Sequence, residues 1–335
     1  MKSNTKKIKA VGLMSGGMDS IIAAKIIKDL GIEVFAIHFS MPWGCGDKPR
    51  AIRSAAEIDV PLKIIELDDN FLEIIKKPSH GVGTAINPCT DCKIYFLKIA
   101  KEYMKEIDAD FIFTGEVLGQ RPMSQVKYRL DLIEKQTELK GYLLRPLSAQ
   151  LLQPTILEEK GLVDRSKLLS ISGRSRKEQI KLATKLNLTE FNQPAGGCLL
   201  TDRNFARRLE DAIQYGYGSF KETTILKWGR HFRINKDFKS IIGRNEKENS
   251  KLVEHASTHD YIMELKEDVG PTLILKGLNP SENILSICGG IIQRFSKFKD
   301  EPSRKFTYYK KEDEKNIMEV EATILSNKQL NQMQL

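Results

Sequence analysis

The six residues 15–20 (Ser-Gly-Gly-Met-Asp-Ser) carry the clearest chemical pattern in the chain. They stand between an apolar run and a helical pattern, so we expect a turn from a strand into a helix. Gly16 and Gly17 allow the backbone to turn and expose N–H groups, and the helix N-terminus adds its positive dipole end. Asp19 can hold Mg²⁺ against phosphates. The predicted phosphate-binding residues are Ser15, Gly16, Gly17, Asp19 and Ser20. No Walker lysine is present, which disfavours transfer of a terminal phosphate.

Three of the five cysteines form a second pattern. Cys89 and Cys92 lie three residues apart at the start of a predicted helix, where the helix dipole is expected to lower a thiol pKa. Cys198 follows two glycines on a predicted loop. Three thiolates could hold three irons of a [4Fe–4S] cluster and leave one iron open. Alternatively, Cys92 and Cys198 could act as a nucleophile and persulfide pair.

Two plainer interpretations of the cysteines stay open. They could be ordinary free thiols, or part of a zinc site that would need Cys45 or Cys288 as well. We expect Cys288 to be a packed thiol of the second domain, and His80 to lie near the cysteine pair. An odd, sparse set of cysteines without an export signal argues against a disulfide scaffold.

Composition restricts the class of protein. The chain has 335 residues, 41% of them hydrophobic, and none of its apolar runs approaches the roughly 20 residues of a membrane helix. The basic start is followed by a stretch broken by glycines, so we expect no signal peptide and a soluble, cytoplasmic protein. A net charge of +9 is compatible with a polyanionic partner such as RNA, or with a lysine-rich surface.

The elements that must position these groups alternate along the first two hundred residues. We predict buried strands at 8–14, 34–39, 62–67 and 111–114, and helices at 20–30, 49–58, 71–76, 90–107 and 178–186. Such alternation predicts an α/β fold, with a Rossmann-like parallel sheet and helices on both faces. The pattern changes near Tyr215. We therefore predict domains at 1–214 and 215–335, the second a smaller α+β domain with strand-like runs at 225–226, 240–242 and 272–275.

Further along the chain, polar residues follow the predicted strands at the sheet edge where ligands of open α/β folds bind. His38 and Phe39 stand at the end of the second predicted strand, Gly115, Glu116 and Gln120 follow the fourth, and Ser124, Gln125 and Arg145 come later. With residues 15–20 and the cysteines, this order resembles the PP-loop tRNA thiolases, most nearly the 4-thiouridine synthetases. The family's N-terminal RNA-binding module and C-terminal rhodanese domain are not apparent.

The resemblance implies several properties. Members of the family have the HUP/PP-loop fold and split ATP between the α and β phosphates to adenylate a substrate. The nucleotide would contact residues 15–20 together with His38, Phe39, Gly115, Glu116, Gln120 and Arg145, with Arg145 stabilising charge on phosphate. Asp19 would bind Mg²⁺, and Cys92 and Cys198 would be catalytic with Asp19. Cys89, Cys92 and Cys198 would be the iron–sulfur ligands.

The second domain resembles the NFACT-R domain, a module implicated in RNA contact. Arg230, Arg233, Arg244 and Lys247 are predicted phosphate contacts, and Trp228, His231 and Phe232 are candidates for stacking on bases. The alternative is a solvated basic face over an ordinary β core.

The function expected is therefore ATP-dependent thiolation of a tRNA uridine, giving 4-thiouridine or 2-thiouridine. The uridine oxygen attacks the α-phosphate, and sulfur then displaces AMP. The sulfur would come from a cysteine persulfide or from sulfide on a cluster iron, supplied by a cysteine desulfurase or free sulfide. The cofactors implied are ATP, Mg²⁺ and a [4Fe–4S] cluster, and the partner is tRNA. A homodimer is compatible with the sequence. The alternatives are a PP-loop ligase or amidotransferase that adenylates a small metabolite, and a non-catalytic RNA- or ribosome-associated protein.

Overall fold

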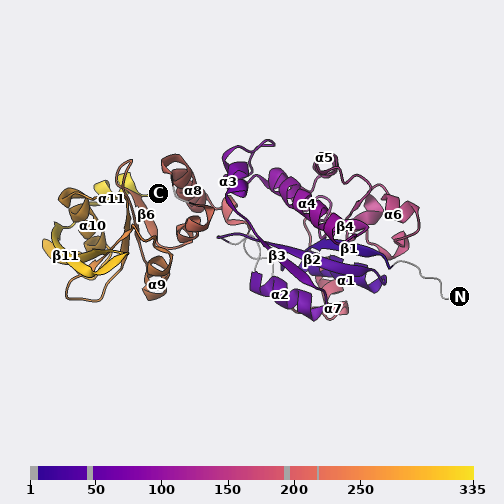
Figure 1. Cartoon of the computed structure of the whole chain (residues 1–335), viewed down its shortest axis with the longest axis horizontal. Helices are drawn as coiled ribbons and strands as arrows, with labels where there is room; N and C mark the ends of the chain where they lie inside the picture. Colours follow the sequence, from indigo (N-terminus) through magenta and orange to yellow (C-terminus); the bar gives the residue numbers. More distant parts are fainter. Residues whose placement is uncertain (1–6, 44–47, 192–196, 217–218) are drawn as a thin grey trace. The chain divides into compact units, whose positions relative to one another are not determined.

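The computed structural model describes residues 7–43, 48–191, 197–216 and 219–335. They form two compact units, Met1–Asp202 and Arg203–Leu335. Each unit has its own sheet and its own apolar core (Figure 1).

The first unit is built on a five-stranded parallel sheet in the order β3-β2-β1-β4-β5. The strands are β1 (Lys9–Leu13), β2 (Glu33–Ser40), β3 (Leu62–Glu66), β4 (Phe111–Thr114) and β5 (Leu143–Leu144). The sequence places four of these strands within one or two residues because each is a short, buried, apolar run. The Rossmann-like fold is confirmed, and the carboxyl ends of all five strands meet at one edge.

Helices cover both faces of this sheet (Figure 1). On one face lie α1 (Met18–Asp29), α2 (Lys48–Glu57) and α7 (Lys177–Lys185); on the other lie α3 (Asp69–Lys76), α4 (Cys89–Glu106), α5 (Lys127–Thr137) and α6 (Ile156–Glu159). Helix α1 is apolar over most of its surface because it packs between the sheet and α7. It is thereby fixed directly behind the predicted phosphate loop.

Helix α8 (Arg203–Tyr215) belongs to the second unit, so the division falls earlier than the predicted 214/215 boundary. The reason lies in the packing of its buried Asp211. This carboxylate pairs with Arg233 and Lys239 of the second sheet, both with N–O distances of 2.7 Å. A buried charge needs such partners, and they fasten α8 to the second unit.

The second unit has a six-stranded antiparallel sheet in the order β11-β10-β8-β9-β7-β6. Its strands are β6 (Arg230–Arg233), β7 (Lys239–Ile242), β8 (Tyr261–Leu265), β9 (Leu273–Lys276), β10 (Ser303–Lys310) and β11 (Asp313–Thr323); its helices after α8 are the 3₁₀ helix η4 (Phe220–Lys227), α9 (Glu246–His255), α10 (Glu282–Arg294) and α11 (Asn327–Met333). The expected α+β class is confirmed. The strand predicted at 225–226 is wrong, because Ile225 and Leu226 are buried as part of η4.

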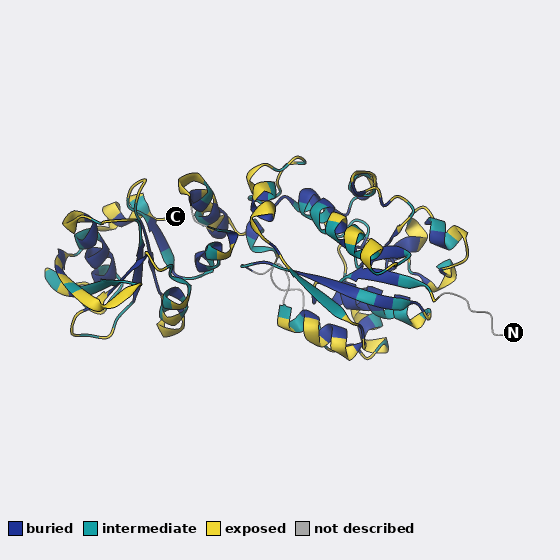
Figure 2. Ribbon diagram, in the orientation of Figure 1, coloured by how far each residue is buried: buried dark blue, intermediate teal, exposed yellow. Residues whose placement is uncertain are grey.

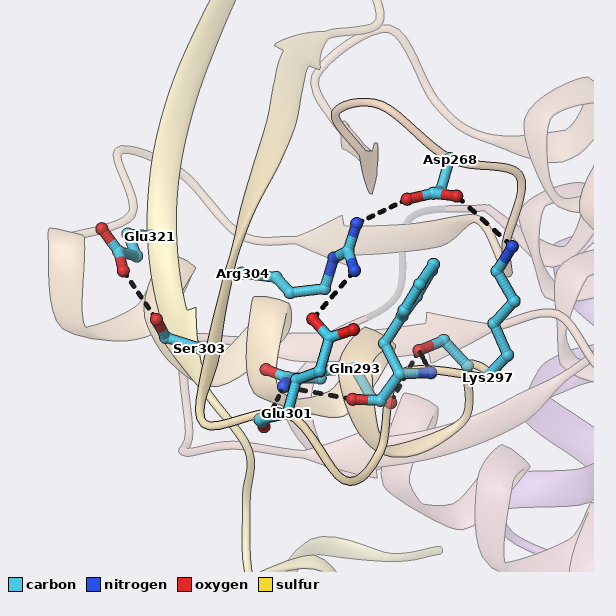
Figure 3. Close-up of polar contacts among 9 residues, drawn as sticks. Asp268, Gln293, Lys297, Glu301, Ser303, Arg304 and Glu321 are labelled. Carbon is cyan, nitrogen blue, oxygen red and sulfur yellow. Dashed lines mark hydrogen bonds and ion pairs between the residues drawn. The ribbon is translucent and has the colours of Figure 1, made fainter.

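Helix α10 lies on one face of this sheet, with its buried residues toward the strands (Figure 2). Its Cys288 is fully buried, which confirms the expected packed thiol. Ion pairs hold the loop that leads from α10 to β10. Arg304 binds Asp268 and Glu301, and Lys297 also reaches Asp268 at 3.3 Å (Figure 3).

Candidate active site

The loop between β1 and α1 has the geometry expected of an anion site. Gly16 has a φ of 76°, which favours glycine. Ser20 Oγ donates to the Gly17 carbonyl at 2.7 Å and accepts from the Ser15 N–H at 3.2 Å, so the serines brace the turn. Gly17 is the N-cap of α1, where no side chain accepts the first-turn N–H groups. Those N–H groups can therefore bind an anion.

Asp19 lies in the first turn of α1, facing the loop that follows β4. Its Oδ2 accepts from Gln120 Nε2 at 3.1 Å, whereas its buried Oδ1 has no hydrogen-bond partner within the described residues. Burial raises the pKa of Asp19, although Gln120, Arg176 and Arg121 oppose this effect. A buried carboxylate oxygen without a partner calls for a cation, so this site fits Mg²⁺.

Gly115 brings the end of β4 against α1. A Cβ at this position would stand 2.6 Å from the backbone of Asp19 and Ser20, a distance that real Cβ atoms do not adopt. Only glycine allows this approach, which places the residues after β4 beside the phosphate loop.

Glu116, which follows Gly115, is the carboxylate that several charged and polar side chains near the phosphate loop contact. It is buried, and it accepts from Arg145 Nε and Thr114 Oγ1, both at 3.1 Å. Lys93 Nζ of α4 lies 3.5 Å from its Oε1. Burial raises the pKa of Glu116, but the charges of Lys93 and Arg145 outweigh it and hold that pKa below its ordinary value.

The structure corrects the expectation for Arg145. Its guanidinium is buried and pairs with Glu116 and Glu134, because a buried cation needs carboxylates. It therefore organises Glu116 and does not face the phosphate loop with a free charge.

His38 and Phe39 lie near the end of β2 and pack against neighbouring elements of the site. His38 is buried, and its Nδ1 lies 2.9 Å from the Met14 carbonyl at the end of β1. Phe39 stacks on Phe96 of α4 with ring centroids 4.4 Å apart. Both side chains are part of the packing and support the elements that form the site, and their contact with a nucleotide stays a prediction.

Two arginines near Asp19 are absent from the sequence-based prediction. The Gly173 N–H donates to the Leu118 carbonyl at 2.7 Å, which places residues 173–176 beside the loop after β4. Arg176 and Arg121 are close enough to Asp19 for their charges to lower its pKa. The run Gly173-Arg-Ser-Arg-Lys before a helix was the available signal for Arg176.

The paired cysteines start α4, which crosses the sheet beside β1 and β4. Cys89 and Cys92 are free and partly buried, and Asn87 Nδ2 donates to Cys89 Sγ at 3.2 Å. Asp91, between them, accepts from the Ser79 and His80 N–H groups and pairs with His80 Nδ1 at 2.8 Å. His80 therefore lies beside the cysteine pair and fastens the preceding loop to the helix.

The expected low thiol pKa is wrong for Cys92. Burial raises the pKa of this thiol, and the neighbouring Cys89 and Asp91 raise it further. The helix N-terminus and Lys93 do not compensate for the lost hydration. A metal or a persulfide would have to supply the deprotonation that the protein alone does not.

Cys198 comes from a distant part of the chain. The Ile86 N–H donates to the Leu200 carbonyl at 3.2 Å, which brings the turn at 198–201 to the loop before Cys89. Cys198 is not among the free thiols, and Cys45 lies outside the described residues. The part of the chain that the structure describes contains no group of three metal ligands. The described residues of the first unit thus offer two free thiols, and the third ligand of a cluster would have to be Cys198.

In the second unit, burial corrects several predicted RNA contacts. His231 and Phe232 are fully buried, and burial holds the pKa of His231 well below its usual value, so neither ring can stack on a base. Arg233 is paired with Asp211 and Arg244 with Glu248. Trp228, Arg230 and Lys247 keep partial or full exposure, and they remain candidates.

The described helices include none that is long and apolar enough to span a bilayer. The parallel sheet, the Ser15–Ser20 loop and the paired thiols together are features of an α/β protein of the PP-loop class. Residues 5–151 match the family model of the thiamine biosynthesis protein ThiI, and residues 229–332 match that of the NFACT protein RNA binding domain. The first unit is thus similar to the PP-loop domain of the ThiI family, and the second unit is similar to the NFACT-R domain.

Individual relatives are more remote. The tRNA-specific 2-thiouridylase MnmA of Listeria innocua is 24% identical over 291 residues, which cover 78% of this chain and 75% of the relative. The U34-tRNA thiolase NcsA of Methanococcus maripaludis, solved with its [4Fe–4S] cluster, gives a TM-score of 0.33 at 18% identity, over 67% of this chain and 72% of that one. The solved complex of a 4-thiouridine synthetase with RNA and bound ATP gives a TM-score of 0.33 at 19% identity. The match covers 65% of this chain and 52% of that one.

Proposed function

We propose that this protein is an ATP-dependent tRNA sulfurtransferase that converts a uridine to 4-thiouridine or 2-thiouridine. The observation that carries the proposal is the ion pair between Lys93, next to Cys92, and Glu116, next to Gly115. It joins a phosphate loop and a pair of free thiols at one edge of one sheet. Adenylation and sulfur delivery need these two kinds of site close together. The similarity to a tRNA 2-thiouridylase over most of the chain supports the same substrate.

In the first step, the phosphates of ATP bind the N–H groups of the loop, and Asp19 holds Mg²⁺, which neutralises phosphate charge. Arg121 and Arg176, which lie near Asp19, receive the departing pyrophosphate. The uridine carbonyl oxygen attacks the α-phosphorus, and the bond to the β-phosphate oxygen breaks. The oxygen of the base then leaves as AMP, a far better leaving group than oxide.

In the second step, the outer sulfur of a persulfide on Cys92 attacks the activated carbon, and AMP departs. A second thiol, Cys89 or Cys198, attacks the inner sulfur, which releases the thiocarbonyl base and leaves a disulfide. A dithiol reductant supplies two electrons and restores both thiols. Lys93 stabilises the anionic sulfur because its charge lowers the pKa of Cys92.

A [4Fe–4S] cluster is the second candidate route for sulfur. Cys89 and Cys92 would supply two of its ligands, and Cys198, whose turn adjoins their loop, the third. Protein purified without oxygen separates the two routes. Iron and sulfide near four atoms per chain, with absorbance near ~400 nm, would favour the cluster. Iron-free protein that accepts labelled sulfur from a cysteine desulfurase would favour the persulfide.

The decisive experiment is mass spectrometry of nucleosides in tRNA from a deletion strain. We expect one thiolated uridine to disappear and to return with the wild-type gene. D19A, C89S and C92S should not restore it, whereas C288S, which removes a cysteine far along the chain in the second unit, should. Unchanged thiolated nucleosides in the deletion strain, without another thiolase, would refute the function.

Release of AMP tests the metabolite-ligase alternative. Purified protein should form AMP and pyrophosphate from ATP only when tRNA is added. AMP formation with a small metabolite and no tRNA would favour a ligase. Binding of tRNA without any AMP formation would favour a non-catalytic RNA-binding protein.

A further inference from the structure

A basic surface with one tryptophan lies where η4 meets α9 in the second unit. We call it the η4–α9 face and define it by Lys227, Trp228, Lys247, Lys251 and His255. Lys247, Lys251 and His255 are spaced by four residues and so lie along one side of α9. Lys227 and Trp228 stand at the end of η4, against that helix.

The positive charges of this face repel one another. Burial lowers the pKa of Lys227, and the charge of Lys251 lowers it further. His255 also has a pKa lowered by burial and by both lysines, although Glu254 opposes this. Glu254 pairs with Lys251 at 2.5 Å, but no ion pair of the described chain engages Lys227 or Lys247. Lysines that have no carboxylate partner, such as these two, are suited to an anionic ligand.

Trp228 gives the face a means of contacting a base. It is partly exposed, and Lys227 Nζ lies 5.4 Å from the centre of its ring. Its indole N–H has no acceptor among the described residues, although tryptophan N–H groups usually find one. A lysine that moves to a phosphate would free the ring face for stacking, while the edge of the ring that carries the N–H stays buried.

The opposite end of the sheet has mixed charge. Acidic side chains line the β10–β11 turn and the exposed β11 strand, where Glu312, Glu314 and Glu319 are paired with Lys310, Lys311 and Lys266. Paired charges of both signs offer a polyanion little net attraction, so the η4–α9 face, with its unpaired lysines, is the better site for such a ligand within this unit.

We infer that the η4–α9 face binds tRNA, with Lys227, Lys247 and Lys251 on phosphates and Trp228 stacked on an unpaired base. This inference rests on the proposed function and names the surface of the second unit that captures its substrate. Stacking on an aromatic ring and lysine contacts to the backbone are the usual means of binding single-stranded RNA.

The test is binding of fluorescein-labelled tRNA to the full chain, followed by anisotropy at several salt concentrations. We expect K227E/K251E to weaken binding at least tenfold and to reduce the slope of log K against log salt by about two. The matched control is K315E/K328E, which makes the same charge change at exposed lysines of β11 and α11. It should bind within twofold of wild type. Equal loss in both variants, or no loss in K227E/K251E, would overturn the inference.

Two further variants guard against misfolding and against another ligand. K227Q/K251Q, with a wild-type circular dichroism spectrum, should lose affinity to an intermediate degree; wild-type affinity would count against the surface. W228A should weaken binding about five- to a hundredfold and W228F less, since one stacked base contributes ~1–3 kcal/mol. Displacement of tRNA by an acidic peptide as readily as by single-stranded RNA would assign the face to an acidic protein segment and overturn the RNA assignment.

Failure of the inference and failure of the proposed function give different results. If the η4–α9 face does not bind tRNA but the proposed function is correct, wild type thiolates tRNA, and K227E/K251E does so with an unchanged KM for tRNA. If the function is wrong, wild type thiolates nothing, whatever its affinity for RNA.

Discussion

Lys93 Nζ lies 3.5 Å from Glu116 Oε1, and this ion pair connects the cysteine helix α4 to the end of β4. Glu116 is buried and also binds Arg145 of the segment after β5. One carboxylate therefore fixes the positions of two cations from different parts of the chain. Because Lys93 adjoins Cys92 and Glu116 adjoins Gly115, the pair fixes the thiols relative to the phosphate loop.

Replacement of Lys93 by methionine should separate the two proposed steps. We expect thiolation to fall at least tenfold, because Cys92 loses a nearby positive charge, while tRNA-dependent release of pyrophosphate keeps at least half its rate. K93R should restore much of the thiolation, and K98M, an exposed lysine on the same helix, should be neutral. Equal loss of both steps in K93M would show that Lys93 only maintains the fold.

Replacement of Arg176 by alanine should weaken binding of the triphosphate. A charged contact contributes ~1.5–3 kcal/mol, so the KM for ATP should rise about ten- to a hundredfold. The control is K181A, an exposed cation on α7 that lies one turn further along the helix. Steady-state kinetics of AMP formation measures both; an equal rise in K181A would show a general charge effect.

Replacement of Asp91 by alanine should release the loop before Cys89. Its carboxylate accepts three hydrogen bonds from Ser79 and His80, and loss of a buried acceptor costs ~1–3 kcal/mol for each stranded group. Hydrogen exchange of peptides from residues 79–87 should become at least tenfold faster. E102A, which removes an exposed carboxylate of α4, should leave these peptides unchanged. Protection equal to wild type in D91A would contradict the role.

Stability of the second unit should depend on pH through Lys239. Burial lowers the pKa of this lysine to about 8, although Asp211 opposes the shift. Between pH 8 and its ordinary value near 10.5, the unfolded chain holds a proton that the native state has released, so stability rises with pH there. The slope is at most about 1.4 kcal/mol per pH unit.

Urea unfolding of wild type and K239M, measured at each pH from 7 to 10, tests this dependence. Methionine removes the titrating group but keeps most of the side-chain volume, so K239M should lose the rise of stability with pH. Identical pH profiles for the two proteins would show that the Lys239 pKa is not lowered in the native state.

Residues 8–20 show how far the sequence alone determined this protein. A buried β run, two glycines and an amphipathic start of α1 specify strand, turn and helix from local preferences, and the same holds for β2, β3, β4 and α4. The position of Cys89 and Cys92 at the start of a helix was likewise predicted from local sequence. These features depend on the residue and its near neighbours, and on which side chains avoid water.

Tertiary structure decided what depends on distant partners. Arg145 looked like a phosphate ligand until Glu116 and Glu134 enclosed it, and His231 and Phe232 looked like an exposed aromatic pair although both faces of their strand are covered. Arg121 and Arg176 meet near Asp19 only because residues 118 and 173 pair. The burial of a side chain and its ion pairs depend on residues that are far apart in the chain. Local sequence patterns therefore located the helices and strands, but they could not show which side chains remain available to bind a ligand.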